Sequence, residues 1–154
     1  MVAPLSEYFG AVRSSDIQDY GCGYQTIDFL GDAALQYKFK TDWIITNPPF
    51  NRAEEFFYRA RELEPHGIAF LTRTAFLEGK RRHEKLFSQF PPFKIMQFVE
   101  RVPIYRGRLA PEGSTAASYC WIIWLKDHHG NTRFDWIPPC RKALEKPEDY
   151  SSIV

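Results

Sequence analysis

The chain has 154 residues, of which 44% are hydrophobic and 16% aromatic, so it can bury one substantial core but is short for two. No segment approaches the roughly 20 apolar residues that cross a membrane, and the N-terminus lacks a secretory pattern, so we expect one cytoplasmic domain over residues 1–154. Twenty basic and nineteen acidic side chains leave a net charge of +1, which neither favours nor excludes a polyanionic partner.

The predicted elements alternate between helices and apolar strands. In chain order, the patterns predict a helix over 4–9, strands over 11–15 and 42–46, a helix over 53–63, a strand over 67–72, a basic helix over 80–89, a strand over 94–99, a long loop over 101–115, and strands over 117–125 and 132–137. Such alternation is typical of an α/β fold with a mostly parallel sheet and helices on both faces.

One strand and the loop after it stand out. The run over 42–46 is apolar and β-branched, as in a strand buried in a parallel sheet, and Pro48-Pro49 ends it abruptly. Asn47 therefore lies at the carboxyl tip of that strand, and residues 51–54 have the form of a helix capping box. A strand terminator with a capping Asn is the simpler interpretation, but the strand before and the helix after favour a functional loop.

The placement of cysteine and histidine argues against a metal site. Cys22, Cys120 and Cys140 are an odd number of cysteines at unrelated spacings, so neither a disulfide framework nor a zinc site is expected. His128 and His129 are adjacent in a predicted turn, where neighbouring side chains point apart. We expect no bound metal.

Residues 42–50, Asp-Trp-Ile-Ile-Thr-Asn-Pro-Pro-Phe, resemble the catalytic motif of methyltransferases that use S-adenosylmethionine and act on exocyclic or amide nitrogens. Residues 103–124 resemble the loop and strand of small phage or prophage-type adenine methyltransferases, so the likeness spans nearly the whole chain. The resemblance implies a Rossmann-like class I sheet and transfer of a methyl group from S-adenosylmethionine to the N6 amino group of adenine in DNA.

The chemistry explains the residue types of this motif. An amino group conjugated to a ring is a poor nucleophile, because its lone pair is delocalised into the π-system. The side-chain oxygen of Asn47 and the carbonyl of Pro48 can both accept from one such NH2 group and aim its lone pair at the methyl donor. Pro49 stiffens the loop, and Phe50 offers a flat face for an extruded base. We assign all four residues to the catalytic site.

The resemblance also implies cofactor-binding residues. Asp16 fits the acidic strand end that holds the cofactor ribose hydroxyls, and Ile17 the apolar residue that packs on the cofactor adenine. Asp28 and Phe29 are similar to a later motif, in which a carboxylate accepts from the adenine amino group beside an aromatic ring. Asn47 is expected to border the same cofactor.

Basic residues gather in the second half of the chain. Eight Lys or Arg against two Glu lie between residues 79 and 110, a stretch that could face phosphate. The charge pattern marks Lys80, Arg81 and Arg82 as residues that could grip phosphate. The resemblance implies that Arg106 and Arg108 contact DNA phosphate or base edges and that Ser114 and Thr115 lie near the target base. A solvated basic surface is the alternative for each of these cations.

The family's first strand and Gly-rich turn would precede the helix over 4–9, and Gly21-Cys-Gly23 is a weak substitute. We therefore expect a partial catalytic domain with an incomplete cofactor pocket, inactive alone or completed by oligomerisation or by another chain. A start codon placed too far downstream, a decayed prophage gene and a split enzyme are the competing explanations, and the first is favoured.

Two other functions stay open. Similar Asn-Pro-Pro loops serve guanine-N2 in RNA and a glutamine amide in protein, so the acceptor need not be DNA. The other alternative is a non-enzymatic prophage remnant or a DNA-binding module.

Overall fold

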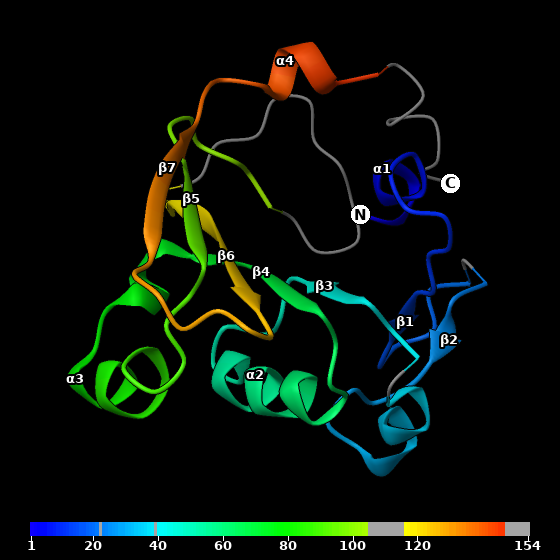
Figure 1. Ribbon diagram of the computed structural model, residues 1–154. Helices are drawn as coiled ribbons and strands as arrows, with labels where there is room; N and C mark the ends of the chain where they lie inside the picture. The colour runs from blue at the N-terminus through cyan, green and yellow to red at the C-terminus, as the bar shows by residue number, and fades with distance from the viewer. Residues whose placement is uncertain (22, 39, 105–115, 147–154) are drawn as a thin grey trace.

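The computed structural model describes residues 1–21, 23–38, 40–104 and 116–146. Its centre is a five-stranded sheet in the order β3-β4-β6-β5-β7, and a separate two-stranded sheet lies on the β3 side (Figure 1). The predicted α/β class is therefore confirmed. None of the helices formed by the described residues has the length and apolarity needed to cross a bilayer.

Four of the five strands run in one direction. The strands are β3 (Trp43–Thr46), β4 (Gly67–Arg73), β5 (Lys94–Phe98), β6 (Tyr119–Leu125) and β7 (Arg133–Ile137). The pairs β3·β4 and β5·β7 are parallel, whereas β6 is antiparallel to both β4 and β5. The carboxyl ends of β3, β4, β5 and β7 consequently meet at one edge of the sheet.

The predicted mostly parallel sheet is thus a mixed one. The difference comes from β6, whose seven residues Tyr-Cys-Trp-Ile-Ile-Trp-Leu are buried or half-buried throughout. Hydrophobicity marks such a strand as central but carries no information about its direction. The insertion of β6 between β4 and β5 therefore could not be predicted from the pattern.

The helices of the chain are short. They are α1 (Val2–Ser6), the 3-10 helix η1 (Asp32–Tyr37), α2 (Ala53–Glu62), the 3-10 helix η2 (Thr74–Leu77), α3 (Lys80–Arg82), the π-helix η3 (His83–Phe87) and α4 (Arg141–Leu144). The predicted helix over 80–89 is divided, because its second half has π-type bonding, with Ser88 N–H donating to the His83 carbonyl at 2.9 Å.

The predicted capping box at the start of α2 is wrong. The N-cap residue is Arg52, without a side-chain cap bond. The Glu54 carboxylate, which would complete the box, is instead bound by Arg81 at 2.8 Å. Arg52 makes an ion pair of 2.9 Å with Glu55.

The core lies between one face of the sheet and three helical segments. The buried residues of this core are Ile44, Ile68, Phe70, Cys120, Ile122 and Trp124 from the sheet, Ala53, Phe57, Ala60 and Leu63 from α2 and its end, Phe76 from η2 and Leu86 from η3. Phe57 packs on Trp124 with ring centroids 4.8 Å apart. Because α2 and η3 share this core, they cover the same face, whereas we predicted helices on both faces.

The two-stranded sheet is formed by β1 (Ser15–Asp16) and β2 (Gln25–Thr26), which pair in parallel. The predicted strand over 11–15 is therefore reduced to its last residue. All four residues of this sheet are exposed, so no buried face stabilises a longer pairing.

Candidate functional site

Asn47 lies at the edge of the sheet where the parallel strands end. It follows directly on β3, whose last residue Thr46 pairs with Phe70 of β4. The side-chain oxygen of Asn47 is buried, and within the described ranges it has no hydrogen-bond partner. A buried acceptor without a donor costs about 1–3 kcal/mol, so this oxygen is a candidate to receive its donor from a ligand.

The two prolines hold this acceptor in place. Pro48 is fully buried, and the Pro49 carbonyl accepts from Arg52 N–H at 2.9 Å, which closes the turn into α2. No donor from the described residues reaches the carbonyl of Pro48. Asn47 and Pro48 therefore present two acceptors on a stiff turn, as the residue pattern predicts.

Phe50 stands at the rim of this turn, 37% exposed. The guanidinium carbon of Arg73 lies over its ring, 4.7 Å from the centroid. The ring of the buried Tyr119 approaches from the sheet, with a centroid distance of 6.1 Å and an angle of 44°. Phe50 thus combines an accessible aromatic surface with a cation beside it.

The strands behind the site are fixed by polar contacts. Thr74 N–H donates to the Ser118 carbonyl at 2.9 Å, and the Thr74 hydroxyl donates to the Gln97 side-chain oxygen at 2.9 Å. The Gln97 amide donates to the carbonyl of Tyr119 at 3.0 Å. These contacts connect β4, β5 and β6 directly beside Phe50.

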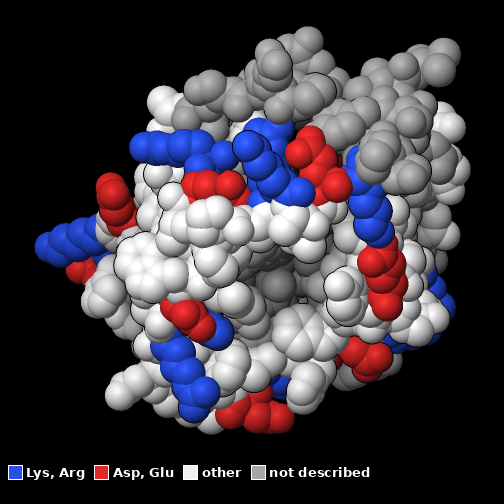
Figure 2. Space-filling view, turned by 90° about the horizontal axis from the view of Figure 1, so that it is seen from above, with Lys and Arg blue, Asp and Glu red and all other residues white. Residues whose placement is uncertain are grey.

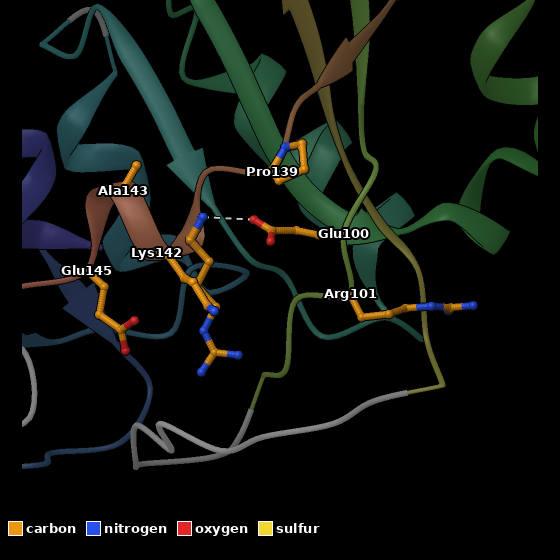
Figure 3. A pocket seen from close by; sticks show the side chains of 7 residues that line it. Glu100, Arg101, Pro139, Lys142, Ala143 and Glu145 are labelled. Atoms are coloured by element: carbon orange, nitrogen blue, oxygen red, sulfur yellow. Dashed lines mark hydrogen bonds between the residues drawn. The ribbon is translucent and has the colours of Figure 1, made fainter.

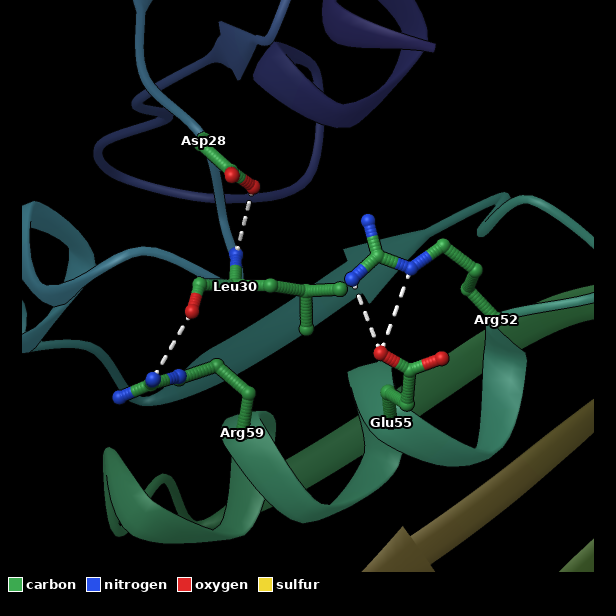
Figure 4. A network of polar contacts seen from close by, with 5 residues as sticks. All are labelled: Asp28, Leu30, Arg52, Glu55 and Arg59. Atoms are coloured by element: carbon green, nitrogen blue, oxygen red, sulfur yellow. Dashed lines mark hydrogen bonds and ion pairs between the residues drawn. The ribbon is translucent and has the colours of Figure 1, made fainter.

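Asp28 and Phe29 are engaged locally. The Asp28 carboxylate accepts from Leu30 N–H at 2.9 Å, and the Leu30 carbonyl accepts from the Arg59 guanidinium at 2.9 Å, so this loop is held on α2 (Figure 4). The ring of Phe29 stacks on Phe56 of α2 at 5.0 Å. Phe29 therefore uses one ring face in packing against α2.

Asp16 and Ile17 belong to the exposed two-stranded sheet. The Asp16 carboxylate accepts from Gln18 N–H at 3.0 Å, and Ile17 is 62% exposed. The Asp16 carbonyl accepts from Ile27 N–H at 2.9 Å, which brings Asp16 and the segment leading to Asp28 together. Asp16 thus ends β1, and Asp28 lies in the loop that follows the neighbouring strand β2.

The fit of these residues to S-adenosylmethionine is incomplete. The exposed carboxylates of Asp16 and Asp28 suit hydroxyl and amino donors, but Ile17 is open to solvent and Phe29 is packed against Phe56. We derive no catalytic step from a cofactor held there.

The basic residues have different surroundings. Arg81 pairs with Glu54, and Arg82 donates to the carbonyls of Phe76 and Glu78 at 2.9 and 2.6 Å, which ties down the turn before α3. Arg82 is therefore occupied by the fold, whereas Lys80 is exposed. The predicted residues Arg106, Arg108, Ser114 and Thr115 lie outside the described residues.

A cavity of about 520 Å³ opens at the same sheet edge, beyond β5 and β7 (Figure 3). Its lining includes Glu100, Arg101, Arg141 and Lys142. Backbone N–H groups of Arg141 and Cys140 donate to Glu100 at 2.8 Å each, and these bonds lower the pKa of the Glu100 carboxyl. Figure 2 shows a hollowed face on which basic and acidic side chains alternate.

Sequence reasoning missed Arg73 and Tyr119. They reach Phe50 only through the pairing of β4 with β3 and β6, in which Arg73 is the partner of Tyr119. The available signal was small: a single cation at the end of an otherwise uncharged strand.

No protein-family model, curated protein or solved structure matches this chain.

Proposed function

We propose that this chain provides the acceptor-binding and catalytic residues of an S-adenosylmethionine-dependent N-methyltransferase acting on adenine N6 in DNA. The observation that carries the proposal is the buried side-chain oxygen of Asn47, which finds no donor among the described residues and lies directly after the carboxyl end of the apolar edge strand β3. Ligands of α/β sheets bind at that end of the strands.

The chemistry of an amino acceptor fits the geometry of the turn. An NH2 group carries two protons, and Asn47 and Pro48 supply two neighbouring oxygens without donors from the described part of the chain. Holding both protons draws the nitrogen lone pair out of conjugation and directs it to one side. Because the side-chain oxygen of Asn47 is buried, an adenine base must displace some of the atoms around it to reach it, as expected for a base that is extruded from DNA.

Phe50 supports a planar acceptor. The residue is 37% exposed beside the buried turn, so an aromatic base can lie on its ring while the amino group of the base points to Asn47. The cofactor would supply an electrophilic methyl group. What this chain contributes is the orientation of the nucleophile and the shape of the acceptor site.

The test is methyl transfer from radiolabelled S-adenosylmethionine to DNA free of methyladenine, with product nucleosides identified by mass spectrometry. The expected product, from wild type alone or together with a complementing chain, is N6-methyladenine. Asn47→Ala should reduce transfer by about 10²- to 10³-fold, the usual effect of removing a hydrogen-bonding group from a reacting centre. Asn131→Ala, an exposed residue of a distant turn, is the control and should retain full activity.

Two results would contradict the proposal. If Asn47→Ala transferred the methyl group at the wild-type rate, Asn47 would have no role in the reaction. Methylation of guanine in RNA or of a glutamine side chain, with DNA unmodified, would assign the site to a different acceptor.

A further inference from the structure

Arg73 is a cation on a fixed backbone. It is the last residue of β4 and pairs with Tyr119 of β6. The next residue is held twice, by Thr74 N–H on the Ser118 carbonyl and by the Thr74 hydroxyl on Gln97. The position from which the Arg73 side chain projects is therefore well defined.

The guanidinium of Arg73 is available to bind a ligand. Within the described ranges, Arg73 has no carboxylate or carbonyl partner, in contrast to Arg81 and Arg82. Its one described contact is the ring of Phe50, 4.7 Å away. A ring interacts with the face of a guanidinium, and the N–H donors lie in the guanidinium plane, so this contact orients the group and leaves its donors available.

Arg73 lies close to the turn that carries Asn47 and Phe50. Arg73 ends β4, the parallel partner of β3, and its guanidinium lies over the ring of Phe50. The free cation thus lies beside the turn that carries Asn47 and Phe50. A base placed on Phe50 brings its own phosphodiester with it, and a planar fork of donors matches phosphate oxygens.

We infer that Arg73 binds the phosphodiester next to the nucleotide whose base is held at Asn47 and Phe50. The inference rests on the proposed function, since it takes a nucleic acid as the acceptor. It makes Arg73 a binding residue for the nucleic acid backbone, with the ring of Phe50 as the surface that orients it.

The experiment measures binding of a fluorescein-labelled single-stranded DNA oligonucleotide of mixed sequence by anisotropy, over a series of salt concentrations. Variants are Arg73→Gln, Arg73→Lys and, as a charge-matched control, Lys40→Gln, which removes a cation before the opposite end of β3. Loss of one phosphate contact on single-stranded DNA lowers the slope of log K against log salt by about 0.7.

The expected result is that Arg73→Gln weakens binding about tenfold at low salt and lowers the slope by about 0.7, while Lys40→Gln changes neither. Arg73→Lys should keep the slope and lose part of the affinity, because the ammonium retains the charge without the fork of donors. In a Phe50→Leu background, Arg73→Gln should cost less affinity than in wild type, because the ring no longer orients the guanidinium.

Three results would overturn the inference, and they differ in what else they affect. If wild type binds DNA and Arg73→Gln has the same slope of log K against log salt, Arg73 does not contact phosphate, and the proposed function is unaffected. If Arg73→Gln lowers the urea midpoint of unfolding but leaves the slope of log K against log salt unchanged, Arg73 only packs on Phe50 in the folded protein. Absence of DNA binding by wild type removes both this inference and DNA as the acceptor.

Discussion

Asn47 is one of the described residues that carry a buried polar atom without a hydrogen-bond partner, which costs the fold stability. Its side-chain oxygen is buried and lacks a donor among the described residues, although neighbouring backbone groups are used in the turn and the strand. An apolar side chain there would avoid the desolvation of an unsatisfied oxygen. That cost is understandable if the donor belongs to the molecule on which the protein acts.

Glu100 provides a second residue-scale property, a dependence of stability on pH. Backbone N–H groups of Arg141 and Cys140 lower the pKa of its carboxyl from the ordinary 4.5. Since the folded pKa is below the unfolded one, the ionised carboxylate stabilises the folded protein above pH 4.5, and this contribution is lost as the pH falls through the folded value.

We therefore expect Glu100→Gln to unfold at lower urea concentration than wild type at pH 7, with the difference shrinking as the pH falls below the ordinary carboxyl range. Gln keeps an acceptor oxygen for the two N–H groups but lacks the charge. Glu84→Gln, on an exposed helix surface, is the control and should follow wild type at every pH. A wild-type stability for Glu100→Gln at pH 7 would show that the charge is unimportant.

At the scale of elements, the contact between β3 and β4 depends on a glycine. A Cβ atom on Gly67 would meet the indole ring of Trp43 at 2.5 Å, and Gly67 is the partner of Trp43 in the parallel pair. The indole therefore lies across the start of β4. Only a residue without a side chain permits this approach.

Gly67→Ala should lower the free energy of unfolding by about 1–3 kcal/mol, as other overpacked sites do. Gly10→Ala is the matched control, because a Cβ there would have nothing within 4 Å. Urea unfolding followed by tryptophan fluorescence measures both variants. Equal stability of the two would mean that Trp43 has room to move.

The sequence predicted those elements whose signal is local. The strands over 42–46, 67–72 and 94–99 and the helix after the prolines were found within one or two residues, because continuous apolar runs and a helical stripe mark buried elements. Of the strand over 11–15 only Ser15 was confirmed, since the segment is exposed and no buried face stabilises a longer pairing. The π-type turn of η3 has no recognised pattern, and it shortened the predicted helix.

At the scale of the whole molecule, the strand order of the sheet brings the residues of the candidate site together. Three of the four strands that run in the same direction, β3, β4 and β5, bring Asn47, Arg73 and Glu100 to one edge of the sheet, although these residues are far apart in sequence. The sequence placed Asn47, Pro48 and Phe50 in one loop because they are consecutive. It could not place Arg73 or Tyr119 beside them, since that proximity depends on the order and register of strands.

The two-stranded sheet with Asp16 and the loop with Asp28 are on the β3 side of the main sheet (Figure 1). The Asp42 carbonyl accepts from Gly67 N–H, so the backbone N–H and C=O groups of Asp42 face β4. Because these groups point to alternate sides along a strand, those of Trp43 and Ile45 face away from β4. β3 is thus an edge strand of apolar sequence next to the predicted cofactor residues. The cofactor roles of Asp16 and Asp28 stay predictions.

The central claim is that Asn47 accepts a hydrogen bond from an exocyclic amino group, and it is tested most directly by a paired comparison of ligands. Two fluorescein-labelled oligonucleotides are used, one with adenine and one with N6,N6-dimethyladenine, which has no N–H to donate. Wild type is expected to bind the adenine form about tenfold more tightly, and Asn47→Ala should bind both equally. Equal binding of the two oligonucleotides by wild type, or a preference that persists in Asn47→Ala, would contradict the claim.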